Sequence, residues 1–311
     1  MARSPAPSAV RSLPVNLLLS LRPSQWTKNL VVFAGLFFAG ADAGQRQRLL
    51  DPVSIGRACA AFAIFCVLAG VVYLINDVHD READARHPVK SRRPIASGAV
   101  TPATALGTAT VLGAGGLGSA FWLEPRFGLI ALSYVVILGL YSLVLKHIVI
   151  VDVLSIAVGF VLRAAAGAVV IGASFSHWLL VETFLLMLFL GLSKRRAELV
   201  SLADDATAHR RTLAHYSPYL LDQMISVVTA STLLGYAFYT ISPDTIQKFH
   251  TDRLIYTLPF PLYGIFRYLY LVHQREGGGS PSEMLIDDRP LLACIMLWVG
   301  TLAVILYGPW R

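Results

Sequence analysis

Long apolar runs constrain the fold of this chain more than any other feature of its sequence. The hydrocarbon core of a bilayer is about 30 Å thick, and an α-helix needs about 20 mostly apolar residues to cross it. The runs lack the residue-by-residue alternation of membrane β-strands. We therefore predict an all-α, polytopic membrane protein with nine transmembrane helices, at residues 28–43, 55–76, 103–123, 127–146, 149–171, 178–193, 220–242, 254–273 and 289–308.

The composition excludes several other classes. Charged residues make up 14% of the chain and hydrophobic residues 55%, whereas a soluble domain carries about 25% charged residues. An ordinary soluble enzyme or a disordered chain is therefore excluded. The three cysteines lack the spacing of metal ligands. The basic residues show no interleaving with aromatic residues, so we expect no nucleic acid as a partner.

The Lys and Arg residues are unevenly divided between the loops. With the N-terminus in the cytoplasm, most basic residues outside the spans fall on the cytoplasmic side, with clusters at 90–93 and 194–196. Because cytoplasmic loops carry an excess of Lys and Arg, we predict a cytoplasmic N-terminus in the plasma membrane. Four spans separate the two clusters. The loops after the second and sixth spans therefore share a side, and we expect the active site there, facing the cytosol.

The segment before the first span does not have the pattern of a cleavable signal. Its start is rich in Ala, Pro and Ser, and the apolar run 13–21 ends at Arg22-Pro23 without a small-residue cleavage site. We predict that residues 1–21 form a mobile tail with a segment able to lie on the membrane surface. Residues 22–311 then form one transmembrane catalytic domain.

A cluster of acidic residues begins where the second apolar run ends. On a continuous helix, at 100° per residue, Asp77, Asp80 and Asp84 lie within about 60° of one another, and Asn76 adds an oxygen beside them. Hard oxygen ligands without Cys or paired His suit Mg²⁺, which also binds substrate phosphates. We predict a metal-bridged diphosphate site at the membrane face. The alternative is a solvated helix end whose aspartates pair with neighbouring arginines.

Three cations follow the acidic cluster. Lys90, Arg92 and Arg93 lie within four residues of one another, and such cations hold phosphate oxygens, Arg in bidentate fashion. They can also serve as a topology signal or contact anionic lipid. We assign substrate binding to Lys90 and Arg92, and leave both interpretations open for Arg93.

Polar residues inside the spans are further candidates, because a charge at mid-bilayer is costly and usually faces the bundle interior. Arg163 is predicted to contact a substrate phosphate; the alternative is an ion pair with Asp152 or Glu182. Tyr141 and Lys146, at the inner end of the fourth span, are predicted to bind substrate. Lys146 can instead extend to the interface as a snorkelling lysine.

The acidic cluster resembles the first motif of the UbiA-type intramembrane prenyltransferase family. That motif, NDxxDxxxD, is matched by Asn76, Asp77, Asp80 and Asp84. The basic stretch that follows, and the long loops after the second and sixth of nine helices, are similar too, so the resemblance covers nearly the whole chain. It implies a helical bundle around a lipid-accessible chamber, Mg²⁺ as cofactor, and a catalytic role for the three aspartates.

The family's second motif, DxxxD after the sixth helix, is replaced in this chain. The sequence there has Lys194–Arg196 followed by Glu198 as the only acid. A cluster of cations is poorly suited to a second metal and well suited to an anion. We therefore assign Lys194, Arg195 and Glu198 to substrate binding. Tyr216 is predicted to help close the site. For Asp222 the same role is an alternative, and we favour a role at the start of the next helix.

Together with the segment Arg22–Asn29, which contains Lys28, this replacement resembles one branch of the family. The branch moves 5-phosphoribosyl from phosphoribosyl diphosphate to polyprenyl (decaprenyl) phosphate, for cell-wall arabinan in arabinogalactan and lipoarabinomannan. The resemblance implies both molecules as substrates, with membrane lipid around the protein. The acceptor phosphate is already anionic and needs no general base, but it does need cations such as Lys28, Lys194 and Arg195.

Two other functions stay open at this point. One is the family's more usual reaction, prenyl transfer from a prenyl diphosphate to an aromatic acceptor, against which the missing second motif argues. The other is a non-enzymatic transporter or a protein that binds anionic lipid, although the chain shows no paired inverted repeat of the transporter kind. The sequence leaves room for a homo-oligomer.

Overall fold

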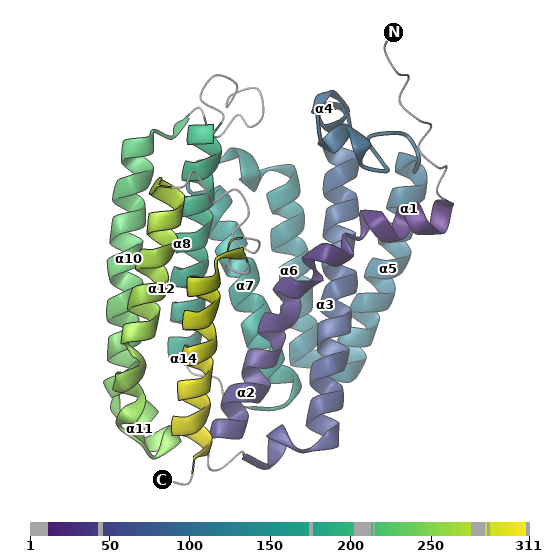
Figure 1. The fold of residues 1–311 in the computed structure, drawn as a ribbon. Coiled ribbons are helices and arrows are strands. Elements are labelled where there is room, and N and C mark those ends of the chain that lie inside the picture. Colours follow the sequence, from purple (N-terminus) through teal and green to yellow (C-terminus); the bar gives the residue numbers. More distant parts are fainter. Residues whose placement is uncertain are drawn as a thin grey trace.

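The computed structural model describes residues 12–42, 46–173, 177–201, 213, 215–274, 284 and 287–308. These residues are mostly helical and contain no strand (Figure 1). The principal elements are α1 (Leu13–Ser20), η1 (Pro23–Phe33), α2 (Ala34–Ala41), η2 (Arg46–Leu49), α3 (Pro52–His79), α4 (Arg81–Arg86), η3 (Lys90–Arg92), α5 (Pro102–Leu123), α6 (Pro125–Leu143), η4 (Leu145–His147), α7 (Val151–Val170), α8 (His177–Ser201), α10 (Pro218–Ile241), α11 (Pro243–Phe249), η6 (Arg253–Thr257), α12 (Pro259–Gln274) and α14 (Arg289–Tyr307), where η denotes a 3₁₀-helix.

Among the described residues, seven of the nine predicted spans are single helices long and apolar enough to cross a membrane: α3, α5, α6, α7, α8, α10 and α14. The count of nine is not confirmed. The predicted span 28–43 falls on the 3₁₀-helix η1 and the short helix α2, because η1 carries polar residues such as Lys28 and Asn29. The predicted span 254–273 falls on η6 and the 16-residue helix α12.

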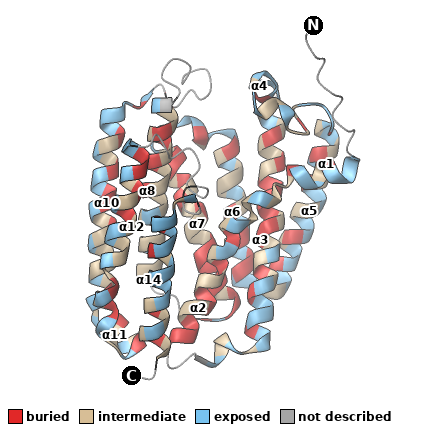
Figure 2. Ribbon diagram, viewed as in Figure 1, coloured by how far each residue is buried: buried red, intermediate tan, exposed pale blue. Residues whose placement is uncertain are grey.

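Helices α3 and α7 form the centre of the bundle. In each, 56% of the most apolar stretch is buried, against at most 28% in the other five long helices. Buried residues accordingly gather on these two helices (Figure 2). Phe65 of α3 lies against Phe127 and Tyr134 of α6, with ring centroids 5.9 and 5.2 Å apart in the edge-to-face geometry that aromatic rings favour.

The segment η1–α2 packs against α7 with almost no side chain between the two backbones. A Cβ at Gly167 would overlap the carbonyl oxygen of Val32, and a Cβ at Gly35 would overlap the backbone of Ala168. Small residues allow this close approach, as they do between other membrane helices. The packing fixes the position of η1 and of the polar residues it carries.

Five of the seven long helices begin at a proline that follows a capping residue. A polar residue before each first turn accepts hydrogen bonds from the turn's backbone N–H groups, and a proline follows it at one of the first two helical positions. The capping residues of α3, α5, α6, α10 and α14 are Asp51, Thr101, Glu124, Ser217 and Asp288. Polar loops are thereby placed at the two ends of the bundle.

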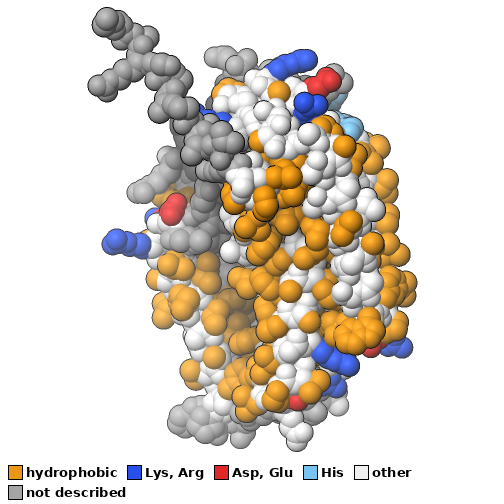
Figure 3. Space-filling view, turned by 90° about the vertical axis from the view of Figure 1, so that its right-hand side faces the viewer, with side chains coloured by type: hydrophobic (Ala, Val, Ile, Leu, Met, Phe, Trp, Pro, Cys, Tyr) orange, Lys and Arg blue, Asp and Glu red, His pale blue; other side chains and the backbone are white. Residues whose placement is uncertain are grey.

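Hydrophobic side chains cover most of the face shown in Figure 3, with charged side chains sparse between its ends. The protein is therefore a multi-pass integral membrane protein. Helix α4 lies at the end of the bundle where α8 ends and α10 begins (Figure 1). The short helix α1 runs across the bundle axis there, and residues 1–11 of the predicted tail lie outside the described residues.

Candidate active site

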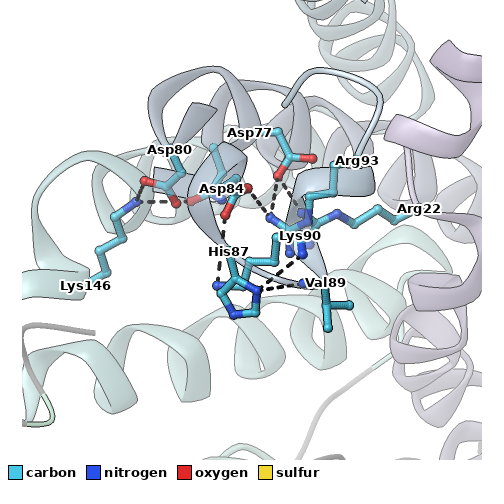
Figure 4. Close-up of polar contacts among 10 residues, drawn as sticks. Arg22, Asp77, Asp80, Asp84, His87, Val89, Lys90, Arg93 and Lys146 are labelled. Atoms are coloured by element: carbon cyan, nitrogen blue, oxygen red, sulfur yellow. Dashed lines mark hydrogen bonds and ion pairs between the residues drawn. The ribbon is translucent and has the colours of Figure 1, made fainter. Parts of the chain in front are cut away.

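The aspartate motif lies at a break between two helices. Asn76 and Asp77 occupy the last turn of α3, which ends at His79, and Asp84 belongs to α4. Between the helices, Asp80 adopts φ −89° and ψ 5° and serves as the first residue outside α4. The predicted single face assumed a continuous helix. The break instead turns Asp80 away from Asp77 and Asp84 (Figure 4).

Two of the motif carboxylates converge on one guanidinium. Arg93 Nη1 lies 3.2 Å from Asp77 Oδ1 and 2.5 Å from Asp84 Oδ2. Arg22 Nη2 adds a second contact to Asp77 Oδ1 at 2.5 Å. Asp77 and Asp84 are only 3% and 4% exposed, so these cations supply the charge that two buried carboxylates require.

The third carboxylate faces a different cation. Lys146, in η4 between α6 and α7, places its Nζ 2.6 Å from Asp80 Oδ1 and 3.4 Å from Asn76 Oδ1. Its side chain is buried and points at the motif (Figure 4). The structure therefore brings Lys146 to the aspartates, as its assignment to the site requires, in place of extending it to the interface.

The basic stretch after α4 divides into contacting and exposed residues. Lys90 Nζ lies 4.0 Å from Asp84 Oδ1, whereas Arg92 is exposed. The two residues in closest contact with the motif, Arg22 and Arg93, were not among the predicted site residues. Their signal was present, because both belong to the basic stretches that carried the family resemblance, but the sequence analysis favoured Arg92 over Arg93.

The donor set fits one hard divalent cation. Among the described residues, no three His, Cys, Asp or Glu side chains gather closely enough to hold a metal alone. Asp77 and Asp84 nevertheless direct oxygens at one point, now taken by Arg93 Nη1. Mg²⁺ is typically bound by one or two carboxylates together with waters and substrate phosphates. Two converging carboxylates meet that requirement, with Asp80 and Asn76 close by in sequence.

A second polar cluster lies near the end of α8. Arg195 Nε is 2.9 Å from Asp152 Oδ2, and Arg195 Nη1 is 2.7 Å from Glu198 Oε2. Lys194 lies 3.8 Å from Glu198 and is 41% exposed. Arg195 also interacts electrostatically with Tyr141 of α6. The only acid of the replaced second motif is thus already engaged with cations.

Tyr216 closes this cluster from the segment before α10. Its hydroxyl donates to Asp152 Oδ1 at 3.1 Å and accepts from the backbone N–H of Ile150 at 2.6 Å. Burial raises the pKa of Tyr216, so the hydroxyl remains a neutral donor. The tyrosine was predicted to help close the site, and it joins the segment before α10 to the start of α7. Asp222 instead pairs with Arg196 at 2.6 Å on α8.

Arg163 is held by neutral groups. It donates to Asn29 Oδ1 at 2.8 Å, to Tyr134 Oη at 2.7 Å and to the carbonyl oxygen of Gly159 at 3.1 Å. The alternative prediction of an ion pair with Asp152 or Glu182 is therefore wrong: Asp152 binds Arg195. These hydrogen bonds hold the guanidinium of Arg163 between η1, α6 and α7. Within the described part of the chain no carboxylate neutralises it there, so its positive charge can attract an anion nearby.

Lys28 of η1 lies within electrostatic range of cations of both clusters. It interacts with Arg22 at the aspartate motif, with Lys194 at the end of α8 and with Arg163. Like charges brought together in a partly buried region repel one another unless an anion joins them. The arrangement therefore suits a phosphate between the aspartate motif and the end of α8.

An apolar cavity of about 470 Å³ lies among α2, α8, α10, α12 and α14. Most of its lining is aliphatic or aromatic, including Phe189 and Tyr268. Glu182 is an acidic residue in this lining. Its Oε1 lacks a hydrogen-bond partner among the described residues and packs against Gly235. The cavity can take an apolar chain.

Comparison with known proteins assigns the family. The model of the UbiA prenyltransferase family matches residues 30–286 of the chain, and the chain belongs to this family. It is 33% identical over 304 residues to a Corynebacterium glutamicum protein named decaprenyl-phosphate phosphoribosyltransferase, covering 96% of this chain and 88% of the relative. A Mycobacterium tuberculosis protein of the same name is 31% identical over 300 residues, with 96% of each chain covered.

A solved structure shares the fold. A UbiA homologue from Archaeoglobus fulgidus bound to DMAPP and Mg²⁺ superimposes with a TM-score of 0.72, covering 94% of this chain and 99% of the homologue. The two sequences are 19% identical. At that identity the likeness supports the fold and carries no information on the substrates of this chain.

Proposed function

We propose that this chain transfers the 5-phosphoribosyl group of phosphoribosyl diphosphate to a polyprenyl phosphate, decaprenyl phosphate above all, and releases diphosphate. The likeness to relatives named for this reaction extends over nearly the whole chain. The product, decaprenylphosphoryl-5-phosphoribose, would supply pentose for cell-wall arabinan.

The observation that carries the proposal is the charge arrangement at the end of α8. A second metal site would need several carboxylates there, but Glu198 is the only acid of the stretch after α8's apolar run, and it follows three cations, of which Arg195 and Lys194 contact it. This end therefore suits an anion bound directly by cations. One metal site and one anion site match a soluble diphosphate donor and a lipid phosphate acceptor.

The donor diphosphate belongs at the aspartate motif. Mg²⁺ would be held by Asp77 and Asp84, with Asp80 and Asn76 beside them, and when bound it neutralises charge on the departing diphosphate. The chain itself supplies cations for the same oxygens. Arg93, together with Arg22, Lys90, Arg92 and Lys146, would hold phosphate oxygens as the ribose C1–O bond breaks.

The acceptor phosphate belongs between the two clusters. Lys28 and Lys194 would bind it, with the charge of Arg163 behind them. Tyr141 and Arg195 border this region, and Glu198 orients Arg195. A phosphate monoester oxygen is already a nucleophile at neutral pH, so the residues need only position it against ribose C1.

The proposed topology has nine crossings. The pair η1–α2 contains 11 and 8 residues, which extend about 34 Å at about 2.0 and 1.5 Å per residue, enough for a core of roughly 30 Å. The pair η6–α12 has 5 and 16 residues and reaches a similar length. Both polar loops then lie on the cytosolic side of the plasma membrane, where phosphoribosyl diphosphate is available, and the N-terminus is cytoplasmic.

The polyprenyl tail would enter the apolar cavity. Pockets of about 300–1,000 Å³ accept drug-sized ligands, so a cavity of about 470 Å³ holds only part of a decaprenyl chain. The rest must extend into the bilayer, and the cavity must therefore be open to lipid. Residues 22–311 would form this single catalytic domain, and α1 would lie on the membrane surface.

A transfer assay tests the proposal. Purified protein in detergent receives Mg²⁺, decaprenyl phosphate and phosphoribosyl diphosphate labelled in the ribose, and label is measured in the lipid extract. We expect transfer that EDTA abolishes and that Asp77→Asn and Asp84→Asn reduce by about 10²-fold or more. Glu82→Gln is the matched control, because Glu82 is an exposed acid of the same motif region.

A different outcome would refute the assignment. If the wild-type protein leaves the lipid unlabelled but transfers a prenyl group from geranylgeranyl diphosphate to an aromatic acid, the proposed reaction is wrong and the family membership stands. If neither transfer occurs while Asp77→Asn and the wild type bind the lipid equally, a binding or transport function replaces both.

A further inference from the structure

A second hollow lies at the seam between α10 and α12, apart from the active site and the apolar cavity. It has a volume of about 430 Å³. Helix α10 packs mainly against α8 and meets α12 at few points. Residues spaced three or four apart on α10, from Asp222 to Leu233, face Phe266, Leu269 and His273 of α12 across the seam. The hollow is therefore a slot between two helical stripes.

The mouth of the slot is charged. Asp222 Oδ1 accepts from Arg196 Nε at 2.6 Å and faces His273 Nε2 at 3.2 Å. The other ring nitrogen of His273 is 2.9 Å from the carbonyl oxygen of Leu269, so the imidazolium form donates at both positions. Asp222 Oδ2 has no hydrogen bond within the described part of the chain, and the Asp222 side chain is 38% exposed.

The mouth lies near the ends of two helices, where a bilayer places lipid head groups. Asp222 is the fifth residue of α10, and His273 is the penultimate residue of α12. Deeper in the slot the walls are apolar, apart from Ser226 and Thr229. Thr229 is seven residues beyond Asp222, about 10 Å along the helix. It is 8% exposed, and its hydroxyl lacks a hydrogen-bond partner among the described residues.

We propose that this slot binds a phospholipid whose head group carries a primary ammonium, of the phosphatidylethanolamine type. The ammonium donates to Asp222 Oδ2, and the phosphate accepts from the Nη groups of Arg196, whose Nε holds Asp222 Oδ1. Thr229 donates to an ester carbonyl, the next polar group of the lipid below the phosphate. One acyl chain then lies along Phe266 and the apolar wall of α10.

The charges distinguish this lipid from its common alternatives. A choline head group carries the same net charge but has no N–H to donate to Asp222. A glycerol head group has no cation, so its phosphate would accept from Arg196 while Asp222 gained no hydrogen bond. Losing one hydrogen bond to a charged group reduces affinity by about tenfold or more.

Native mass spectrometry of the full chain tests the proposal. Delipidated protein receives phosphatidylethanolamine, phosphatidylcholine or phosphatidylglycerol with the same acyl chains. We expect the ethanolamine lipid to bind about tenfold more tightly than the other two. Ala230→Phe fills the slot without touching the ion pairs and should remove this binding. Val227→Phe is the matched control, since Val227 is an exposed residue of α10 outside the slot-lining stripe.

Asp222→Asn removes the carboxylate that binds the ammonium and leaves the apolar slot intact. It should reduce the affinity for the ethanolamine lipid to that for the choline lipid. Equal binding of the three lipids by the wild-type chain would overturn the proposal, as would retention of the preference in Ala230→Phe. A dimer that Ala230→Phe abolishes, with no lipid preference, would overturn it too and assign the seam to a contact between two copies. None of these results depends on the proposed transfer reaction.

Discussion

Arg195 and Asp152 form a buried ion pair, and replacing one partner should destabilise the protein by a different amount from replacing the other. The two side chains are 3% and 0% exposed, and Arg195 Nε lies 2.9 Å from Asp152 Oδ2. At an effective dielectric constant near 20, Coulomb's law gives about 6 kcal/mol of attraction at this distance. Desolvation of both groups offsets much of that gain. What each substitution leaves buried therefore decides its effect.

Arg195→Met leaves the Asp152 carboxylate inside the protein with Tyr216 as its side-chain donor. Breaking a buried pair in this way costs about 3–5 kcal/mol of folding free energy. Asp152→Asn is milder, because Arg195 keeps Glu198 at 2.7 Å and the amide oxygen still accepts a hydrogen bond. It should cost about 1.5–3 kcal/mol, the value of a hydrogen bond to a charged group.

The double variant provides the strongest test. With Met at 195 and Asn at 152, no unpaired charge stays buried, so its stability should exceed that of Arg195→Met alone. Denaturation of the purified variants in detergent, followed by tryptophan fluorescence, measures the order. Lys194→Met is the control for the same helix end; its partner is 3.8 Å away and its side chain 41% exposed, so we expect a change below about 1 kcal/mol. The reasoning would be refuted if the two single variants lost equal amounts of folding free energy and the double variant lost their sum.

Three further predictions concern the active site and its support. Arg93→Gln should reduce label transfer at least about tenfold, the value of one charged hydrogen bond, and Arg92→Gln should reduce it less; the reverse order would contradict the contacts. Lys146→Met should raise the KM for phosphoribosyl diphosphate by a similar factor, because Asp80 then repels the diphosphate, and an unchanged KM would argue against that placement. Gly167→Ala should destabilise the protein by about 1–3 kcal/mol, since its Cβ overlaps the carbonyl oxygen of Val32, and a wild-type denaturation midpoint would contradict this packing.

Run length and composition were sufficient for the all-α membrane class and for seven long helices. They were insufficient for the run at 28–43. Averaged over the run, the hydropathy predicts a single span. Lys28 and Asn29, however, carry polar groups that would have no partners on a helix facing lipid. Arg163, far along the chain, accepts Asn29 as a partner, and Gly167 lets the 3₁₀ segment approach α7. Both contacts are tertiary, so local sequence did not reveal them.

The site was predicted in its location more than in its geometry. The aspartate motif lies at the end of α3, where the sequence placed it. The helix break at Asp80 was missed, because helical periodicity assumes continuity and Lys146, 66 residues away, holds Asp80 in place. Arg22 and Arg93 were missed for a related reason. A basic residue near an acidic motif in sequence can have several roles. The fold decides which basic residues contact the carboxylates.

The pairing of the motif with cations favours joint binding of a divalent metal and the diphosphate of the proposed reaction. Each of the three carboxylates faces a cation from a different part of the chain, namely Arg22, Arg93 or Lys146. A divalent cation alone would have to displace Arg93 and leave it beside positive charge. A diphosphate alone would approach the carboxylates that these cations now neutralise. With both bound, Asp77 and Asp84 would hold the metal, and Arg22, Arg93 and Lys146 would bind the phosphate oxygens, so the local charge would stay balanced.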